Sequence, residues 1–144
     1  MNTEPQVRQT LFDRVIEHFD AMERPSLNRI GDCVYRADDG NRCFVGALIP
    51  DDLYDSRIEG QPVYVATVGF PSLLHDILLK SFAPLGVESG PEGYLPDNLT
   101  ALLADLQMIH DGWSYEEGKE GPYEQLEIAA EKHGLTYKRT REAV

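Results

Sequence analysis

Apolar residues recur every three to four positions in four stretches of this 144-residue chain, and each stretch predicts an amphipathic helix. The first helix begins at the capping pair Thr3 and Gln6 and ends at Pro25. Gly112 is expected to end the third helix, because glycine readily adopts the left-handed conformation that follows a helix. The four helices are expected at about residues 3–24, 71–82, 97–112 and 122–133.

Between the first two helices the apolar pattern changes to one typical of strands. Residues 33–36 and 42–49 are rich in strand-forming side chains and flank a turn that contains Asp39 and Gly40. An Asp-Gly pair between two such runs predicts a β-hairpin.

The remaining elements complete the expected fold. A short helical turn over residues 50–54 and a third strand over residues 61–68 should follow the hairpin. We therefore expect an α+β fold in which a small antiparallel hairpin or three-stranded sheet packs against about four helices. The length is that of a single domain, residues 1–144, with a frayed basic tail at residues 138–144.

The composition narrows the class of protein. The hydrophobic content of 42% is ordinary for a globular chain, and no run approaches the roughly 18 apolar residues that a membrane helix needs. The first residues lack the basic and apolar regions of a signal peptide, so we expect a cytoplasmic protein with reduced thiols. A pI near 4.6 argues against direct binding to nucleic acid or to an anionic membrane.

The negative charge is concentrated in one part of the chain. Residues 88–131 carry eleven carboxylates and one base, Lys119, and so supply −10 of the formal net charge of −12. Aromatic residues of the kind that anchor protein interfaces lie in the same stretch. Solubility is one explanation for such charge, and a basic protein partner is the other. The expected partner contacts are Glu88, Glu92, Asp97, Trp113, Tyr115, Glu116, Glu117, Glu120 and Glu124.

A cysteine-dependent enzyme is the main alternative. Cys43 would be the nucleophile, with His110 as base and Asp111 as the group that orients it; His75 and Asp76 could take the last two roles. The signal is non-specific, because Cys43 lies in a strand-like run and not at a helix N-terminus that would lower its pKa. The other reading is that the cysteines are small buried hydrophobic residues.

No cofactor or metal is expected. Two cysteines nine residues apart in the sequence, with isolated histidines, do not match the ligand spacing of structural zinc sites. Only one of the two possible hairpin registers would place Cys33 opposite Cys43, and a reducing cytoplasm gives a disulfide little use. The chain also contains no phosphate-binding loop, dinucleotide-binding glycine pattern or nucleophile elbow.

Two segments resemble a group of small phage and prophage proteins of unassigned function. The resemblance rests on a Cys-x-Tyr-Arg run at residues 33–36, a Cys-x-Val-Gly-x-Leu-Ile-Pro-Asp run at 43–51, Glu59-Gly60 and a Leu-Gln-x-x-His-Asp run at 106–111. These runs lie in two segments, residues 33–60 and 106–111. The resemblance implies a bacterial or phage origin and the cytoplasm of a bacterial cell, but no reaction, and it draws attention to Cys33, Cys43, His110 and Asp111 as a set.

Together these observations favour a small acidic phage or prophage accessory protein that is not an enzyme. It is expected to bind and inhibit a host protein with a basic surface, such as a nucleic-acid-handling defence complex, in the manner of an anti-CRISPR protein. Competition for the basic groove would be electrostatic and steric. A structural or homo-oligomeric phage protein is a third possibility.

Overall fold

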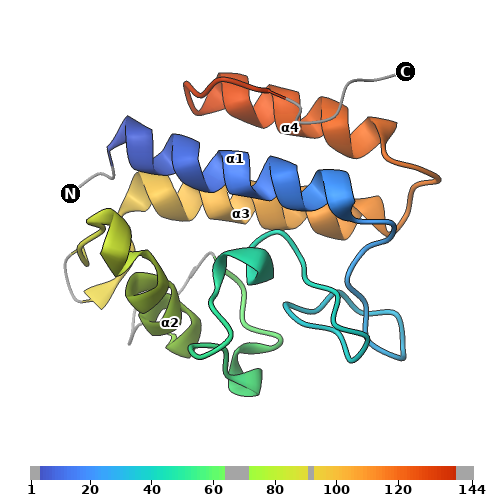
Figure 1. The fold of residues 1–144 in the computed structure, drawn as a ribbon, viewed down its shortest axis with the longest axis horizontal. Coiled ribbons are helices and arrows are strands. Elements are labelled where there is room, and N and C mark those ends of the chain that lie inside the picture. The colour runs from blue at the N-terminus through green and yellow to red at the C-terminus, as the bar shows by residue number, and fades with distance from the viewer. Residues whose placement is uncertain (1–3, 64–71, 91–92, 139–144) are drawn as a thin grey trace.

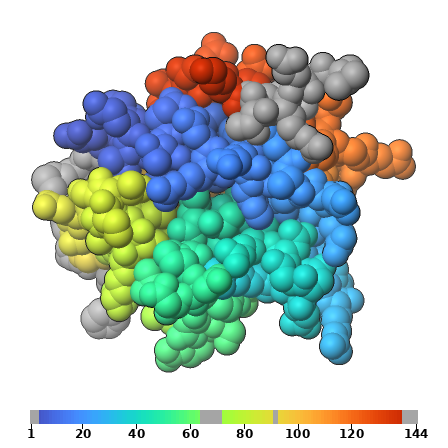
Figure 2. All heavy atoms as spheres, in the orientation of Figure 1, coloured from blue at the N-terminus to red at the C-terminus, as the bar shows by residue number. Residues whose placement is uncertain are grey.

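The computed structural model describes residues 4–63, 72–90 and 93–138, and four α-helices dominate these ranges. Helices α1, α3 and α4 lie alongside one another, while α2 and the long segment between α1 and α2 lie below them in the view of Figure 1. Figure 2 shows that this segment forms a continuous surface beneath α1. The helices are α1 (Pro5–Ala21), α2 (Leu73–Phe82), α3 (Asp97–Trp113) and α4 (Glu120–Lys132), with short 3-10 turns at Gly46–Leu48, Ser56–Ile58 and Ala83–Leu85.

The expectation of an α+β fold is wrong. The described residues are mostly helical and form no sheet, and the region of the expected hairpin contains two isolated bridges, Leu27 with Cys33 and Arg36 with Arg42. The chain leaves an extended path directly after Arg42, because the N–H of Ala47 bonds to the carbonyl of Cys43 and a 3-10 turn follows. Residues 64–68 of the expected third strand lie outside the described residues.

A side chain takes the place of a neighbouring strand in this region. The Glu59 carboxylate accepts hydrogen bonds from the backbone N–H of Tyr35 at 2.8 Å and of Arg36 at 3.1 Å. Gly46 lies directly against the Tyr35 carbonyl, where a Cβ atom would overlap it. Buried backbone groups must be paired, and here the pairing is made by a carboxylate and not by a ladder.

The four helices are close to the predicted ones, with different ends. Helix α1 ends at Ala21, four residues before Pro25, and α4 begins two residues earlier than expected. Gly112 does not end the third helix, since α3 continues through it to Trp113. Gly134, by contrast, has the left-handed conformation expected after a helix, with φ of 68°.

An aromatic cluster joins the three long helices. The Phe19 ring of α1 contacts Trp113 of α3 with ring centroids 4.9 Å apart and Tyr123 of α4 at 4.6 Å. Phe44, from the segment below, meets the same ring at 5.2 Å. Phe19 and Phe44 are fully buried, and aromatic pairs of this kind contribute about 0.5–1.5 kcal/mol each beyond the area they bury.

Lys119 ties the α3–α4 connection to the end of α1. Its ammonium group donates to the backbone carbonyls of Phe19 and, at 2.9 Å, of Met22, and lies 4.2 Å from the centre of the Phe19 ring. The last carbonyls of a helix have no partner within the helix and carry partial negative charge. The one base of residues 88–131 is therefore directed inward, onto α1.

We predict that Lys119→Met lowers the free energy of unfolding by about 2–3 kcal/mol, because the substitution removes charged hydrogen bonds, a favourable interaction with the helix end and a cation–π contact. Urea unfolding followed by circular dichroism measures the change. Lys132→Met is the matched control, since Lys132 is 63% exposed and its ion pair with Asp105 is a surface pair worth less than about 1 kcal/mol. Equal effects of the two substitutions would contradict the role given to Lys119.

Candidate functional site

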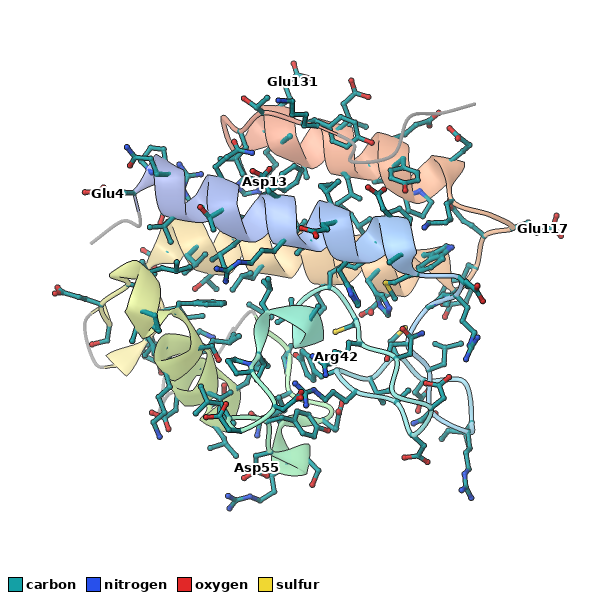
Figure 3. The ribbon with its side chains drawn as sticks, viewed as in Figure 1. Glu4, Asp13, Arg42, Asp55, Glu117 and Glu131 are labelled. Carbon is teal, nitrogen blue, oxygen red and sulfur yellow. The ribbon has the colours of Figure 1, made fainter. Side chains whose placement is uncertain are left out.

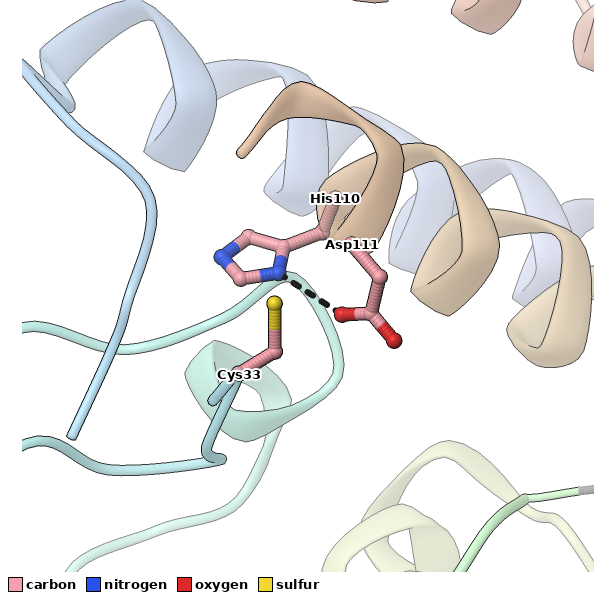
Figure 4. A group of neighbouring side chains, drawn as sticks. All are labelled: Cys33, His110 and Asp111. Carbon is pink, nitrogen blue, oxygen red and sulfur yellow. Dashed lines mark hydrogen bonds and ion pairs between the residues drawn. The ribbon is translucent and has the colours of Figure 1, made fainter. Parts of the chain in front are cut away.

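Cys33, His110 and Asp111 come together at the end of α3. Figure 4 shows the cysteine, from the segment below, facing the two residues of the last helical turn. One thiol, one ring nitrogen and one carboxylate oxygen lie within 4.8 Å of one another. Among the residues predicted as a chemical set, these three are the ones that the fold assembles.

The hydrogen bonds of His110 define its protonation. The backbone N–H of Ser26 donates to Nε2 at 3.0 Å, so Nε2 has no proton. The ring proton is then on Nδ1 and is donated to Asp111 at 3.1 Å. His110 is fully buried and neutral in this arrangement, and both of its nitrogens are engaged. It anchors the backbone after α1 to α3 and has no free lone pair with which to take a proton.

The Cys33 thiol is not activated. Burial raises its pKa to about 12, and the nearby negative charge of Asp111, which the thiol hydrogen-bonds, adds to the increase. A nucleophilic thiol needs the opposite environment, with positive charge nearby and a lowered pKa. The position of Cys33 therefore stabilises the protonated thiol.

The same geometry disfavours a metal ion at this cluster. A histidine that binds a metal through one nitrogen ordinarily donates its other N–H to an acceptor. Here the other nitrogen, Nε2, faces the N–H of Ser26, so a metal on Nδ1 would leave Nε2 either facing a donor with its own proton or fully deprotonated. Three ligands also fall short of the four in a structural zinc site. A structural hydrogen-bond cluster fits these residues better.

Cys43, the expected nucleophile, lies elsewhere in the core. It is 3% exposed, its sulfur accepts from the backbone N–H of Gly46 at 3.2 Å, and burial raises its pKa to about 12.

The other candidate base, His75, is also buried, with Nε2 donating to the carbonyl of Val63 and Nδ1 accepting from the N–H of Leu95. Asp76 pairs with Lys80 on the exposed side of α2 and does not contact the His75 ring nitrogens. The described residues present no exposed thiol next to an available imidazole.

Residues of the two phage-like segments meet in one hydrogen-bond network. Gln107 of α3 donates to the Tyr35 hydroxyl at 2.7 Å, and its carbonyl oxygen accepts from the N–H of Val63. The Tyr35 hydroxyl in turn donates to the carbonyl of Gln61. Glu59, which pairs the backbone at Tyr35, also accepts from the Tyr54 hydroxyl at 2.6 Å. These contacts hold the irregular segment against α3.

The sequence analysis assigned no role to Gln107 or Ser26. Ser26 contributes its backbone N–H, which donates to His110.

Five of the nine predicted partner contacts lie on one part of the molecule. Tyr115, Glu116, Glu117, Glu120 and Glu124 lie along the α3–α4 connection and the first half of α4, and all five are exposed. Figure 3 shows Glu117 at one extreme of the molecule and Glu131 above α4. Two further exposed carboxylates, Glu127 and Glu131, extend the line along α4.

The other predicted contacts do not belong to this surface. Asp97 begins α3, and a 17-residue helix places it about 24 Å from the far end, where the connection to α4 starts. Glu88 is exposed beyond α2, and Glu92 lies outside the described residues. Trp113 is 3% exposed, so it is part of the core and cannot act as a surface anchor.

Asp105 joins α3 to α4 at the other end of the pair. Its carboxylate lies 2.9 Å from the Lys132 ammonium and 2.7 Å from Nε2 of His133. Burial alone would raise the pKa of Asp105, but the hydrogen bonds from His133 and Lys132 lower it overall. Lys132, the basic residue in the last turn of α4, is therefore paired with a carboxylate of α3.

Comparison with known proteins found no matching family model, no matching curated protein and no matching solved structure. The resemblance to phage proteins remains a prediction. Within the described residues, no helix is both long enough and apolar enough to cross a membrane.

We predict that neither thiol reacts as an activated nucleophile. At pH 8 a pKa near 12 leaves so little thiolate that alkylation of Cys33 or Cys43 in the folded protein should be on the order of 10³-fold slower than in the unfolded chain. Iodoacetamide labelling of Cys33→Ser and Cys43→Ser, with and without guanidinium, measures each thiol separately. Fast labelling of Cys43 in the folded protein would restore the thiol-enzyme alternative.

We predict that His110 can be replaced only by a residue that still accepts the Ser26 N–H. His110→Leu leaves that buried donor without a partner and should cost about 1–3 kcal/mol beyond any loss of packing. His110→Gln keeps an acceptor at similar reach and should retain the larger part of the stability. Urea unfolding of both variants is the measurement, and equal destabilisation would show that the hydrogen bond does not matter.

Proposed function

We propose that this protein is a non-enzymatic binding protein whose acidic α4 surface docks onto a basic surface of another protein. The α4 surface is defined as Tyr115, Glu116, Glu117, Glu120, Glu124, Glu127 and Glu131. The observation that carries the proposal is the separation of charge along this part of the chain. Its carboxylates are exposed, whereas Lys119 is directed onto α1 and Lys132 is paired with Asp105.

The four glutamates of α4 follow one side of the helix. Positions 120, 124, 127 and 131 are three or four residues apart, so their side chains project in similar directions. At 1.5 Å per residue the mean spacing is about 5.5 Å per charge, compared with about 3.4 Å along one strand of DNA. The surface thus offers a weaker line of negative charge than a nucleic acid, and it needs contacts of another kind to compete with one.

The partner best suited to this surface is a basic protein groove that ordinarily holds nucleic acid. Long-range attraction between opposite charges accelerates encounter and favours this orientation over others. Occupation of the groove excludes nucleic acid from it, so the biochemical effect is inhibition by competition. A nucleic-acid-handling complex of a bacterial host, the target class expected for a small phage protein, fits this description.

We predict that the triple substitution Glu124→Lys, Glu127→Lys and Glu131→Lys reduces partner capture at least 10-fold. These positions lie beyond the first turn of α4, so the favourable effect of Glu120 at the helix start is kept. The measurement is affinity capture from a bacterial lysate at 50 mM and 500 mM salt, quantified by mass spectrometry, because screening by salt should weaken an interaction between charged surfaces.

A second triple variant separates position from net charge. Asp38→Lys, Asp52→Lys and Glu88→Lys change the charge by the same amount at exposed sites away from α4 and should leave capture unchanged. Loss of capture by both triple variants would indicate only a net-charge effect. Capture that survives the α4 substitutions would overturn the proposed function.

A further inference from the structure

Two contacts fix which residues of α3 lie beside which residues of α4. Asp105 of α3 pairs with Lys132 of α4, and Glu116, just after α3, lies directly against Gly121 at the start of α4. The two helices therefore run antiparallel, as Figure 1 also shows. We call the exposed strip between these two contacts the α3–α4 seam.

Two large apolar side chains lie at about the same level along this helix pair. Met108 is one turn after Asp105, and Ile128 is one turn before Lys132, so the antiparallel register places them on the same rung. Met108 is 69% exposed and Ile128 is 57% exposed. Among the described residues only four large hydrophobic side chains are exposed, and two of the four share this rung.

No side chain covers the next turn of α3. Gly112 is one turn beyond Met108, and a Cβ atom placed on it would meet no other atom within 4 Å. The surface beyond Met108 is therefore open to a partner. Exposed apolar side chains bordered by charged ones are the kind of surface that contacts an amphipathic helix.

Both sides of the seam are acidic. Glu124 and Glu131 of α4 are exposed next to Ile128 in sequence, and Asp111 of α3 is half-exposed beyond Met108. Helix α3 contains no lysine or arginine, and the one basic residue of α4, Lys132, is paired with Asp105. A second copy of this chain would bring carboxylates against carboxylates, which is unfavourable at low salt.

We infer that the α3–α4 seam binds a basic amphipathic helix of the partner protein, with Met108 and Ile128 contacting its apolar side and the carboxylates of α4 contacting its lysines and arginines. This inference rests on the proposed function and specifies which part of the partner is recognised. It also supplies the additional contacts that the sparse charge of α4 requires. Methionine is well suited to such a site, because its flexible, polarisable side chain adapts to different apolar partners.

The test uses two synthetic 16-residue peptides of equal positive charge. One has leucines at helical spacing with lysines on the opposite side, and in the other glutamine replaces every leucine. We expect the leucine peptide to bind the full-length protein at least 10-fold more tightly in fluorescence anisotropy. Met108→Gln with Ile128→Gln should remove that 10-fold preference and leave binding of the glutamine peptide unchanged, while Ile30→Gln, at an 83% exposed site in the segment below, should change neither.

A spectroscopic measurement locates the peptide. With ¹³C-methyl methionine, the Met108 signal should shift on binding, while Met22, which is 7% exposed, serves as an internal reference. Equal affinity for the two peptides, or binding that the Met108 and Ile128 substitutions do not affect, would overturn the inference and leave the proposed function standing. Binding of both peptides that persists in the α4 triple variant would instead contradict the proposed function.

Discussion

The insertion of Lys119 at the end of α1 is the contact on which the arrangement of the three long helices depends. It is made by a residue of the α3–α4 connection, so one ammonium group joins all three helices at the same end of the bundle. Tyr123, four residues later, donates its hydroxyl to the buried Asp20 of α1. Three carbonyl partners, those of Phe19, Asp20 and Met22, and an aromatic ring satisfy a charge that would otherwise be costly to remove from water. The polar contacts of Lys119 and Tyr123 lie beside the aromatic cluster around Phe19. Loss of these hydrogen bonds would therefore also weaken the packing of the aromatic rings.

The segment between α1 and α2 is organised by side chains from distant parts of the sequence. Glu59 pairs the backbone at Tyr35, Gln107 pairs Tyr35 and Val63, and His110 pairs Ser26. Each contact does for one or two backbone groups what a neighbouring strand does for many. A histidine beside an aspartate and two cysteines first suggest catalysis. In the structure the histidine is neutral and the thiols are protonated, and these are the states that hydrogen bonding within a core requires. For the two cysteines the pKa is raised, and this direction favours a structural role over a nucleophilic one.

The helices were predictable because periodic apolar residues report burial along a single element, and all four lie within a few residues of the expected ranges. The hairpin was not, since Asp39 and Gly40 describe a turn but not whether two strands continue from it. The extended path ends in the turn closed by the Ala47 N–H on the Cys43 carbonyl, while Gly46 packs against the Tyr35 carbonyl and Glu59 pairs the backbone at Tyr35. Neither of the last two contacts can be read from local sequence. For the site, the sequence could place His110 beside Asp111. It could not show that Cys33 and not Cys43 joins them, or that Trp113 is buried.

The line of glutamates on α4 is unfavourable for the helix that carries it. Like charges three or four residues apart destabilise a helix by about 0.2–0.5 kcal/mol per pair, and the sequence 120, 124, 127, 131 contains three such neighbours. A lysine at position 124 or 127 would relieve this repulsion and leave the protein strongly acidic, so solubility alone does not require the arrangement. Lys119 is used inside the fold and Lys132 is paired with Asp105, so neither of these two lysines is paired with the glutamates of the α4 surface. This local cost, beside an exposed Met108 and Ile128, supports the proposal of a basic, partly apolar partner.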